Sequence, residues 1–197
     1  MKVIIAEKPD QGATLASIFQ TKKRQGYIEI FPNDLFPDGA YVTWAIGHLF
    51  QLAPPERYRP EWKRWTLKAL PIIPERFEYE VEKAKAKQFN VVKELLRKPE
   101  VTEIIHAGDA GREGELIVRN IIRLSGVHKP MKRLWLSSLT PKAIEEGFRR
   151  LLDERMTRPL YEEAYARACA DWLVGMNASR AYSLLLKERG MNDVFSV

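Results

Sequence analysis

The sequence predicts an α/β fold that has a mainly parallel sheet and is followed by an α-helical segment. Up to about residue 152, short apolar runs alternate with amphipathic helical patterns, as in a parallel sheet with crossover helices. Two of the strand-to-helix turns carry carboxylates. From Pro159 to about Lys187 the alternation stops and only helical periodicity continues. We therefore expect one domain over residues 1–152 and a second, helical region over 153–197.

The elements of the first half follow from apolar runs and turn residues. Residues 2–6 form an apolar run typical of a buried strand, and a helical pattern follows over about 11–19. Two more strands are expected at 27–31 and 41–45, with proline, asparagine and glycine between them. Five prolines between residues 54 and 74 favour an extended connection lying over a domain.

The second half repeats the strand and helix alternation and then becomes helical. Pro99 ends the helix predicted at 87–98, and Thr140 followed by Pro141 has the form of a helix N-terminus. Beyond Pro159 the pattern fits one long helix or two short ones, whose aromatic stripe indicates core packing. In chain order the predictions are a helix at 87–98, a strand at 101–106, a helical pattern at 116–122, a strand at 132–136, a helix from Pro141 to about 152 and the helical pattern at 159–187.

Length and composition favour a globular protein without a membrane span. A chain of 197 residues with 45% hydrophobic residues can bury a core. No stretch approaches the roughly 20 apolar residues that cross a bilayer, and no signal-peptide pattern is present. The single cysteine, Cys169, excludes an intrachain disulfide and a cysteine zinc site. We predict a cytoplasmic location and no membrane partner.

The positive charge is concentrated in one stretch. Residues 57–98 hold 12 Lys or Arg and 6 Asp or Glu, a local excess of 12 − 6 = 6 that equals the net charge of the whole chain. Aromatic residues interleave with these cations, as they do where proteins bind nucleic-acid backbones and bases. A solvated basic face with a few core aromatics remains an alternative interpretation.

The segment 107–115 (AGDAGREGE) combines three carboxylates, Asp109, Glu113 and Glu115, with three glycines on a strand-to-helix turn. Glu7 follows another strand, and ligands of open α/β sheets bind at the carboxyl ends of the strands. Together these acids form the all-oxygen site that Mg²⁺ prefers, while Lys8 and Arg112 could contact a phosphate. This favours metal-assisted phosphoryl chemistry. Alternatively, Glu113 and Glu115 only face the positive end of their own helix.

Two other motifs carry less information. The glycine spacing GxxGxxG does not match the dinucleotide-binding fingerprint, and acids occupy the turn where a pyrophosphate needs bare amides. His48 and His106 each adjoin an apolar strand without a second metal ligand at suitable spacing. Both are interpreted as structural, with contact to nucleic acid as the alternative for His48.

Five motifs in order resemble the amino-terminal part of the bacterial type IA DNA topoisomerases, closest to the topoisomerase III group. They are residues 6–9 (AEKP), 44–49 (WAIGHL), 107–115, 136–141 (LSSLTP) and 167–177 (RACADWLVGMN). The resemblance covers essentially the whole chain. It implies a Rossmann-like Toprim domain at 1–152 and, at 153–197, the beginning of a helical domain that supports the DNA gate.

The resemblance also implies roles for single residues. An acid at the Glu7 position lies beside the scissile phosphate and protonates the leaving oxygen, and Arg167 can pair with Asp171 four residues later on one helix face. The predicted catalytic residues are Glu7, Lys8 and Glu113, and the predicted Mg²⁺ ligands are Glu7, Asp109 and Glu113. Predicted DNA contacts are Lys8, His48, Arg112, Arg167, Arg180 and Ser196, with Asp171 and Glu115 in supporting roles.

Two departures from the family pattern shape the predicted function. Gly111 replaces the second acid of the Asp-x-Asp-x-Glu pattern, which favours a single Mg²⁺ held by Glu7 and Asp109. The family's nucleophilic tyrosine belongs to a Tyr-x-Arg motif in a later domain. Residues 165–167 (YAR) have these letters but lie in the predicted helix that carries the 167–177 motif, so Tyr165 is rejected as the nucleophile. We expect a fragment that binds single-stranded DNA and needs the remaining domains for their tyrosine. A Toprim nuclease using metal-activated water, or a non-catalytic nucleic-acid-binding module, are the alternatives.

Overall fold

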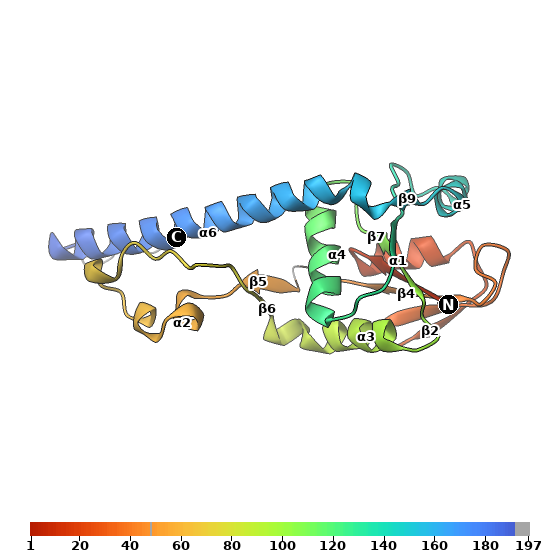
Figure 1. Ribbon diagram of the computed structural model, residues 1–197, viewed down its shortest axis with the longest axis horizontal. Coiled ribbons are helices and arrows are strands. Elements are labelled where there is room, and N and C mark those ends of the chain that lie inside the picture. The colour runs from red at the N-terminus through yellow and green to blue at the C-terminus, as the bar shows by residue number, and fades with distance from the viewer. Residues whose placement is uncertain (48, 192–197) are drawn as a thin grey trace. The chain divides into compact units, whose positions relative to one another are not determined.

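The computed structural model describes residues 1–47 and 49–191 (Figure 1). The chain folds into two compact units. Unit 1 comprises Met1–Phe50 and Val81–Ala164, and unit 2 comprises Gln51–Glu80 and Tyr165–Val197. The sequence predicts one domain over 1–152 and a helical region over 153–197. Those limits stay a prediction, because the two units are defined by how the chain packs.

Unit 1 is built on a seven-stranded sheet in the order β2-β3-β4-β1-β7-β8-β9. The four central strands β4, β1, β7 and β8 run parallel, while β2, β3 and β9 pair antiparallel at the two edges. This confirms the predicted mainly parallel α/β fold. The strands are β1 (Lys2–Ala6), β2 (Thr21–Arg24), β3 (Tyr27–Ile30), β4 (Ala40–Trp44), β7 (Glu103–Ala107), β8 (Met131–Arg133) and β9 (Leu152–Asp153).

Helices cover both faces of the sheet because its central strands are apolar on both sides. The helices α1 (Pro9–Ala16) and α5 (Pro141–Arg149) bury Leu15, Ile144 and Phe148 in one cluster with Ile4 and Ile105. Because neighbouring residues along a strand point to opposite faces, each central strand also presents side chains to the other side of the sheet. The other face is covered by α3 (Ala86–Arg97) and α4 (Arg112–Ser125), which contact each other, β4 and β7.

Two local signals in unit 1 act as predicted. The Thr140 hydroxyl accepts a hydrogen bond from the Ala143 N–H at 3.4 Å and caps α5, whose first residue is Pro141. Gly126 ends α4 with a φ of 70°, a left-handed conformation that favours glycine. The short elements η3 (Lys83–Lys85) and η4 (Glu154–Met156) complete this unit.

Unit 2 packs the proline-rich segment against a long helix. The helix α6 (Arg158–Glu188) is continuous, as Figure 1 shows, and enters unit 2 at Tyr165. The ring of Trp172 meets those of Tyr58 and Phe77 edge-on, with centroids 5.9 and 5.5 Å apart. The side chain of Asn177 accepts the Ile72 N–H at 2.7 Å and donates to the Ile72 carbonyl at 2.9 Å. The predicted core role of the aromatic stripe is thus confirmed at Trp172.

The prediction of an extended connection over residues 54–74 is wrong in part. Short helical turns interrupt it, because Pro55 and Pro60 each begin a turn at a position where the missing N–H is harmless. The turns are α2 (Pro55–Tyr58), η1 (Pro60–Lys63) and η2 (Leu67–Ala69). The strands β5 (Phe50–Leu52) and β6 (Tyr79–Val81) pair where the chain leaves and re-enters unit 1.

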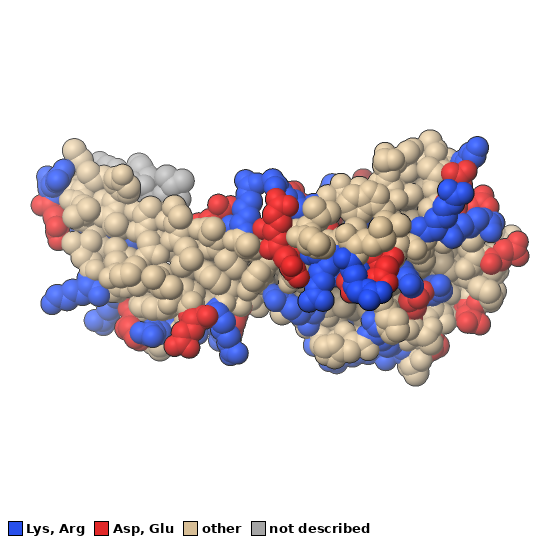
Figure 2. Space-filling view, turned by 45° about the horizontal axis from the view of Figure 1, so that its top comes forward, with Lys and Arg blue, Asp and Glu red and all other residues tan. Residues whose placement is uncertain are grey.

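The basic stretch of the sequence is divided between the units. Residues 57–80, with 6 cations and 4 acids, belong to unit 2, and residues 81–98, with 6 cations and 2 acids, belong to unit 1. Figure 2 shows acidic and basic side chains interleaved over the visible face. The charge excess in the sequence is therefore shared between the two units.

Candidate functional site

The two acidic turns predicted from the sequence meet at one edge of the sheet in unit 1. The parallel pairing of β1 and β7 sets Ala6 opposite Ala107, so the residues that follow these strands emerge together. The Asp109 N–H donates to Glu7 Oε2 at 3.1 Å, and Lys8 Nζ donates to Asp109 Oδ2 at 3.0 Å. Lys8 Nζ also lies 3.4 Å from Glu7 Oε1. One ammonium group thus bridges two carboxylates.

Gln11 completes this group and was not singled out by the sequence reasoning. Its amide nitrogen donates to Asp109 Oδ1 at 2.8 Å, and its amide oxygen accepts the Glu7 N–H at 2.8 Å. The available signal was its place in the first turn of α1, directly after the acidic turn. We call Glu7, Lys8, Gln11 and Asp109 the edge cluster.

The edge cluster combines a sheltered acid with exposed partners. Glu7 is buried, whereas the Lys8 and Asp109 side chains are 60% and 51% exposed. The hydrogen bond to Asp109, together with the charge of Glu7, raises the pKa of Lys8, so this side chain stays protonated at neutral pH. A cavity of about 540 Å³ adjoins the cluster and is lined by Gln11, Asp109 and residues of the LSSLTP motif.

A buried arginine supports the turn that carries Asp109. Arg133, at the end of β8, is fully buried and donates to the carbonyl oxygens of Gly108 at 2.9 Å and Asp109 at 2.8 Å. It also donates to the carbonyls of His106 and Leu134, and its Nε donates to Glu115 Oε1 at 2.5 Å. Arg133 therefore fixes the backbone of the acidic turn from the interior of the unit.

Glu115 is the anion that balances this arginine. Its second oxygen accepts from Arg119 Nε at 2.7 Å and lies 3.5 Å from His106 Nε2. His106 Nδ1 accepts the Gly108 N–H at 3.2 Å, and burial beside Arg133 lowers the pKa of this imidazole well below its ordinary value. The histidine is neutral and structural, as the sequence suggested. We call His106, Glu115, Arg119 and Arg133 the buried cluster.

Two of the three glycines of the motif permit the close approach of turn and helix. A Cβ atom at Gly114 would lie 2.8 Å from the Asp109 nitrogen, and one at Gly108 would lie 2.9 Å from the Gly114 carbonyl oxygen. Both distances are below those of real Cβ contacts. A Cβ at Gly111, by contrast, would meet nothing within 4 Å. The position of the missing family acid therefore has room for a side chain.

The remaining predicted residues of unit 1 stay outside the edge cluster. Glu113 is exposed in the first turn of α4, and Arg112 pairs with Glu163 at 2.6 Å. Over residues 1–47 and 49–191, no group of three His, Cys, Asp or Glu side chains could hold a metal ion. The structure brings Glu7 and Asp109 together, and it does not add Glu113 to them.

The predicted DNA contacts of unit 2 differ in exposure. Arg167 lies 3.7 Å from Asp171, which confirms the expected pair on one face of α6. Arg180 is buried, donates to the Trp62 carbonyl at 2.6 Å and stacks on Trp65, so its guanidinium is used inside the unit. Desolvation lowers the pKa of Arg180. The predicted contacts His48 and Ser196 lie outside the described residues.

The edge cluster fits a single hard cation. Lys8 Nζ already occupies a position between the two carboxylates, at 3.0 and 3.4 Å from their oxygens, and so acts as a stand-in for a metal ion. Mg²⁺ takes oxygen ligands and commonly uses one or two carboxylates, with water and phosphate oxygens completing its shell. Glu7 and Asp109 satisfy that requirement for one ion.

Comparisons with known proteins show what the chain is similar to. The Toprim domain family matches residues 2–139. The DNA topoisomerase 3 of Bacillus subtilis (strain 168) is 50% identical over 180 residues, which are 91% of this chain and 24% of that protein. The DNA topoisomerase 3 of Staphylococcus haemolyticus is 49% identical over 180 residues, again 91% and 24%. The chain spans about a quarter of the length of these relatives.

A solved structure shares the fold. Full-length topoisomerase I from Thermotoga maritima superposes with a TM-score of 0.57 at 24% identity, over 90% of this chain and 25% of that one.

No helix within the part of the chain that the structure describes has the length and apolar character of a membrane span.

Proposed function

The chain belongs to the Toprim domain family, and on that premise we propose that it supplies the acidic, metal-binding half of the strand cleavage and religation site of a type IA DNA topoisomerase. The observation that carries this proposal is the edge cluster, in which Lys8 bridges Glu7 and Asp109. The attacking tyrosine would come from the remaining domains of such an enzyme. The relatives named above, which are DNA topoisomerases 3, support this assignment.

The edge cluster suits transfer of a phosphodiester to a tyrosine. Attack of the tyrosine oxygen on phosphorus, with the tyrosine proton passing to water, forms a 5′-phosphotyrosine and breaks the bond to the 3′-oxygen of the cut strand, which needs a proton. Glu7 is the proposed proton donor, because its carboxyl is sheltered and lies at the sheet edge. Religation reverses the step, with Glu7 taking the proton back.

Lys8 and the metal ion would both offset the negative charge of the phosphate. The Lys8 ammonium is exposed and protonated, so it can move from Asp109 to a phosphate oxygen when a strand binds. Mg²⁺ held by Asp109, with Glu7 as a second ligand while it does not carry the proton, would supply further positive charge beside the phosphate. Glu113 is exposed in the first turn of α4, four residues after Asp109 in the chain. It is proposed as a supporting ligand that binds the metal through water.

We propose a single strand of DNA as the bound substrate. Unit 2 contains a cavity of about 300 Å³ lined by Arg57, Arg59, Trp62 and Arg76, with the Arg59 guanidinium 5.1 Å from the Trp62 ring centroid. Cations beside aromatic faces accept the backbone and the unstacked bases of single strands. The exposed pair of Arg167 and Asp171 belongs to the same unit.

Complementation tests the proposal. The chain is mixed with the remaining domains of a topoisomerase 3, and relaxation of negatively supercoiled DNA is measured with Mg²⁺. We expect activity with the natural chain, loss of at least about 100-fold with Glu7→Gln, as is typical for removing a general acid, and no loss with Glu94→Gln, an exposed acid on α3. Thermal unfolding must show that Glu7→Gln remains folded.

Three results would contradict the proposal. Activity unaltered by Glu7→Gln would remove the role given to that acid. Metal-dependent cutting of a labelled single strand by the chain alone, lost in Asp109→Asn, would show a nuclease in place of a half-site. Binding of the strand without any effect of metal or of either substitution would show a binding module.

A further inference from the structure

A second cavity lies in unit 1 at the sheet edge opposite the edge cluster. Its walls come from the second half of α4, from the loop 127–130 and from η4 with the first turns of α6. That loop leads into the beginning of β8, which is parallel to β7, so it lies at the amino edge of the strands. The 14 residues of α4 span about 20 Å between the two edges. The cavity is therefore separate from the site proposed for cleavage.

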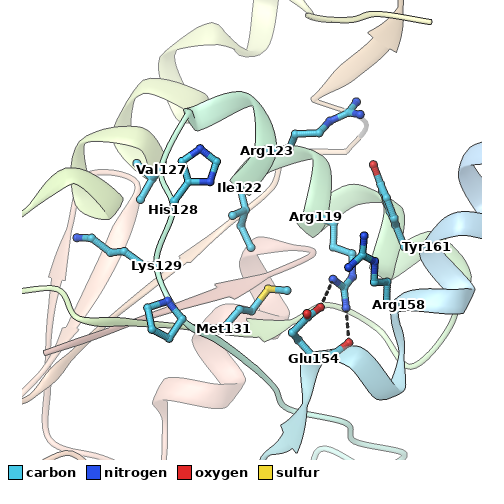
Figure 3. Close-up of a pocket in the computed structure, with 11 residues that line it drawn as sticks. Arg119, Ile122, Arg123, Val127, His128, Lys129, Met131, Glu154, Arg158 and Tyr161 are labelled. Carbon is cyan, nitrogen blue, oxygen red and sulfur yellow. Dashed lines mark hydrogen bonds and ion pairs between the residues drawn. The ribbon is translucent and has the colours of Figure 1, made fainter. Parts of the chain in front are cut away.

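The size of this cavity suits a small molecule. Its volume is about 700 Å³, within the approximate range of 300–1,000 Å³ typical of small-molecule sites. Figure 3 shows apolar side chains, Ile122 and Met131, between two groups of polar ones. One group contains Arg119, Glu154, Arg158 and Tyr161, and the other contains His128 and Lys129.

The charge of the lining favours an anion. Arg119, Arg123, Lys129 and Arg158 line the cavity with one acid, Glu154. Glu115 and Glu162, outside the lining, pair with Arg119 and Arg158, so these seven side chains carry a net charge of 4 − 3 = +1. Glu154 is engaged by Arg119, whose terminal nitrogens donate to its carboxylate at 2.6 Å and its carbonyl at 2.7 Å. A phosphate group would therefore meet a cationic lining, to which it binds by charge-assisted hydrogen bonds.

The cations at the rim are held in place by contacts that leave donors for a ligand. Arg158 donates through Nε to Glu162 at 3.1 Å, and Lys129 donates one hydrogen bond to the Lys98 carbonyl at 2.9 Å. Neither contact uses the terminal fork of the guanidinium or all three ammonium hydrogens. Arg119 is fixed by Glu115 and Glu154 and acts as a rigid wall. Such preorganisation reduces the entropy lost on binding.

We propose that this cavity binds a nucleoside phosphate. The phosphate lies against Lys129 and His128 at one end, and the flat base lies on the apolar floor of Ile122 and Met131, with its polar edge toward Arg158 and Tyr161 at the other end. The combination of an apolar middle with a basic rim matches a ligand that carries both a ring and a charge. The source of that chemistry is either a free nucleotide or the terminal nucleotide of a strand, and the experiment separates the two.

The test follows backbone amide signals of the whole 197-residue chain by NMR during titration with adenosine monophosphate, inorganic phosphate or adenosine. We expect the nucleotide to shift signals of residues 127–131 and 158–161, more strongly than phosphate or adenosine alone, and to leave residues 7–11 unchanged. Arg158→Gln should weaken binding about tenfold, the equivalent of one charge-assisted hydrogen bond. Arg150→Gln, an exposed arginine outside the cavity, is the matched control and should have no effect.

A 5′-phosphorylated oligonucleotide identifies the source. Tighter binding than the mononucleotide, with the same shifted residues, indicates a strand end, and weaker binding indicates a free nucleotide. The proposal is overturned if no signal moves up to about 10 mM nucleotide, a concentration at which even very weak sites fill. It is also overturned if phosphate alone is equally effective, if the shifts fall on residues 7–11, or if both Arg158→Gln and Lys129→Gln bind as the natural chain does.

Discussion

The edge cluster and the buried cluster meet at the turn between β7 and α4, where Asp109 belongs to the first and Arg133 binds the backbone from the second, but they differ in exposure. The side chains of Lys8 and Asp109 are more than half exposed, whereas Glu115 and Arg133 have no exposed surface. Charges in water interact weakly and can exchange partners, while a buried pair must stay fully hydrogen-bonded. The comparison shows one turn held by hydrogen bonds from inside the unit while the charged side chains at its outer side remain exposed to solvent.

The largest expected effect comes from breaking the buried cluster. Arg133→Met would leave the buried Glu115 with Arg119 as its remaining cationic partner and remove the donors to the Gly108 and Asp109 carbonyls. The free energy of unfolding, measured by urea denaturation, should fall by about 3–5 kcal/mol. Arg155→Gln is the control, because its pair with Asp153 at 2.8 Å is exposed and contributes less than about 1 kcal/mol. Equal losses in the two variants would contradict the distinction between the clusters.

Gly114→Ala should disturb the edge cluster through its backbone. The new Cβ overlaps the Asp109 backbone, so the turn or the start of α4 must shift. We expect unfolding free energy to fall by about 1–3 kcal/mol, as for overpacked sites, although alanine favours helix elsewhere. Gly111→Asp meets open space at the N-cap of α4 and should raise stability by a few tenths of a kcal/mol. Urea denaturation of both variants measures the difference, and a stable Gly114→Ala would refute the steric argument.

The buried imidazole makes stability depend on pH. Because burial depresses the pKa of His106, the unfolded chain binds a proton below pH about 6.5 that the folded chain does not. Stability from this group is therefore complete above that pH and falls by about 1 kcal/mol between pH 6.5 and 5.5. His106→Asn keeps an acceptor for the Gly108 N–H and should show a shallower pH dependence in urea denaturation. Parallel curves for the two proteins would show that another group titrates.

The smallest effect on stability is expected at Lys8. Its ion pairs are exposed, so Lys8→Gln should change the free energy of unfolding by less than about 1 kcal/mol. Mg²⁺ affinity should instead rise about fivefold, since a competing charge near 4 Å is worth about 1 kcal/mol in water. Asp109→Asn should lose Mg²⁺ binding, and Lys87→Gln, exposed on α3, should change neither quantity. Isothermal titration with Mg²⁺ tests all three, and weaker binding by Lys8→Gln would contradict the stand-in interpretation.

Much of the fold could be predicted because its signals are local. Apolar runs, prolines and caps located most of the strands and helices, with errors at their ends, such as the helix expected at 11–19 and found at Pro9–Ala16. Glu7 and Asp109 could be placed together because carboxyl ends of parallel strands share one edge. The short turns of residues 55–69 were missed, since prolines favour both extended chain and helix starts.

The sequence by itself determined the alternation of strands and helices, the two acidic turns and the family to which they point, because each depends on residues close together in the chain. Only the tertiary structure decided that Arg133 supports the Asp109 turn, that Glu115 is its buried counter-ion, and that residues 51–80 pack with α6. These contacts depend on strand order and on which charges are removed from water. Neither the strand order nor the burial of a charge can be read from a periodic pattern in the sequence, because both arise from the packing of distant segments.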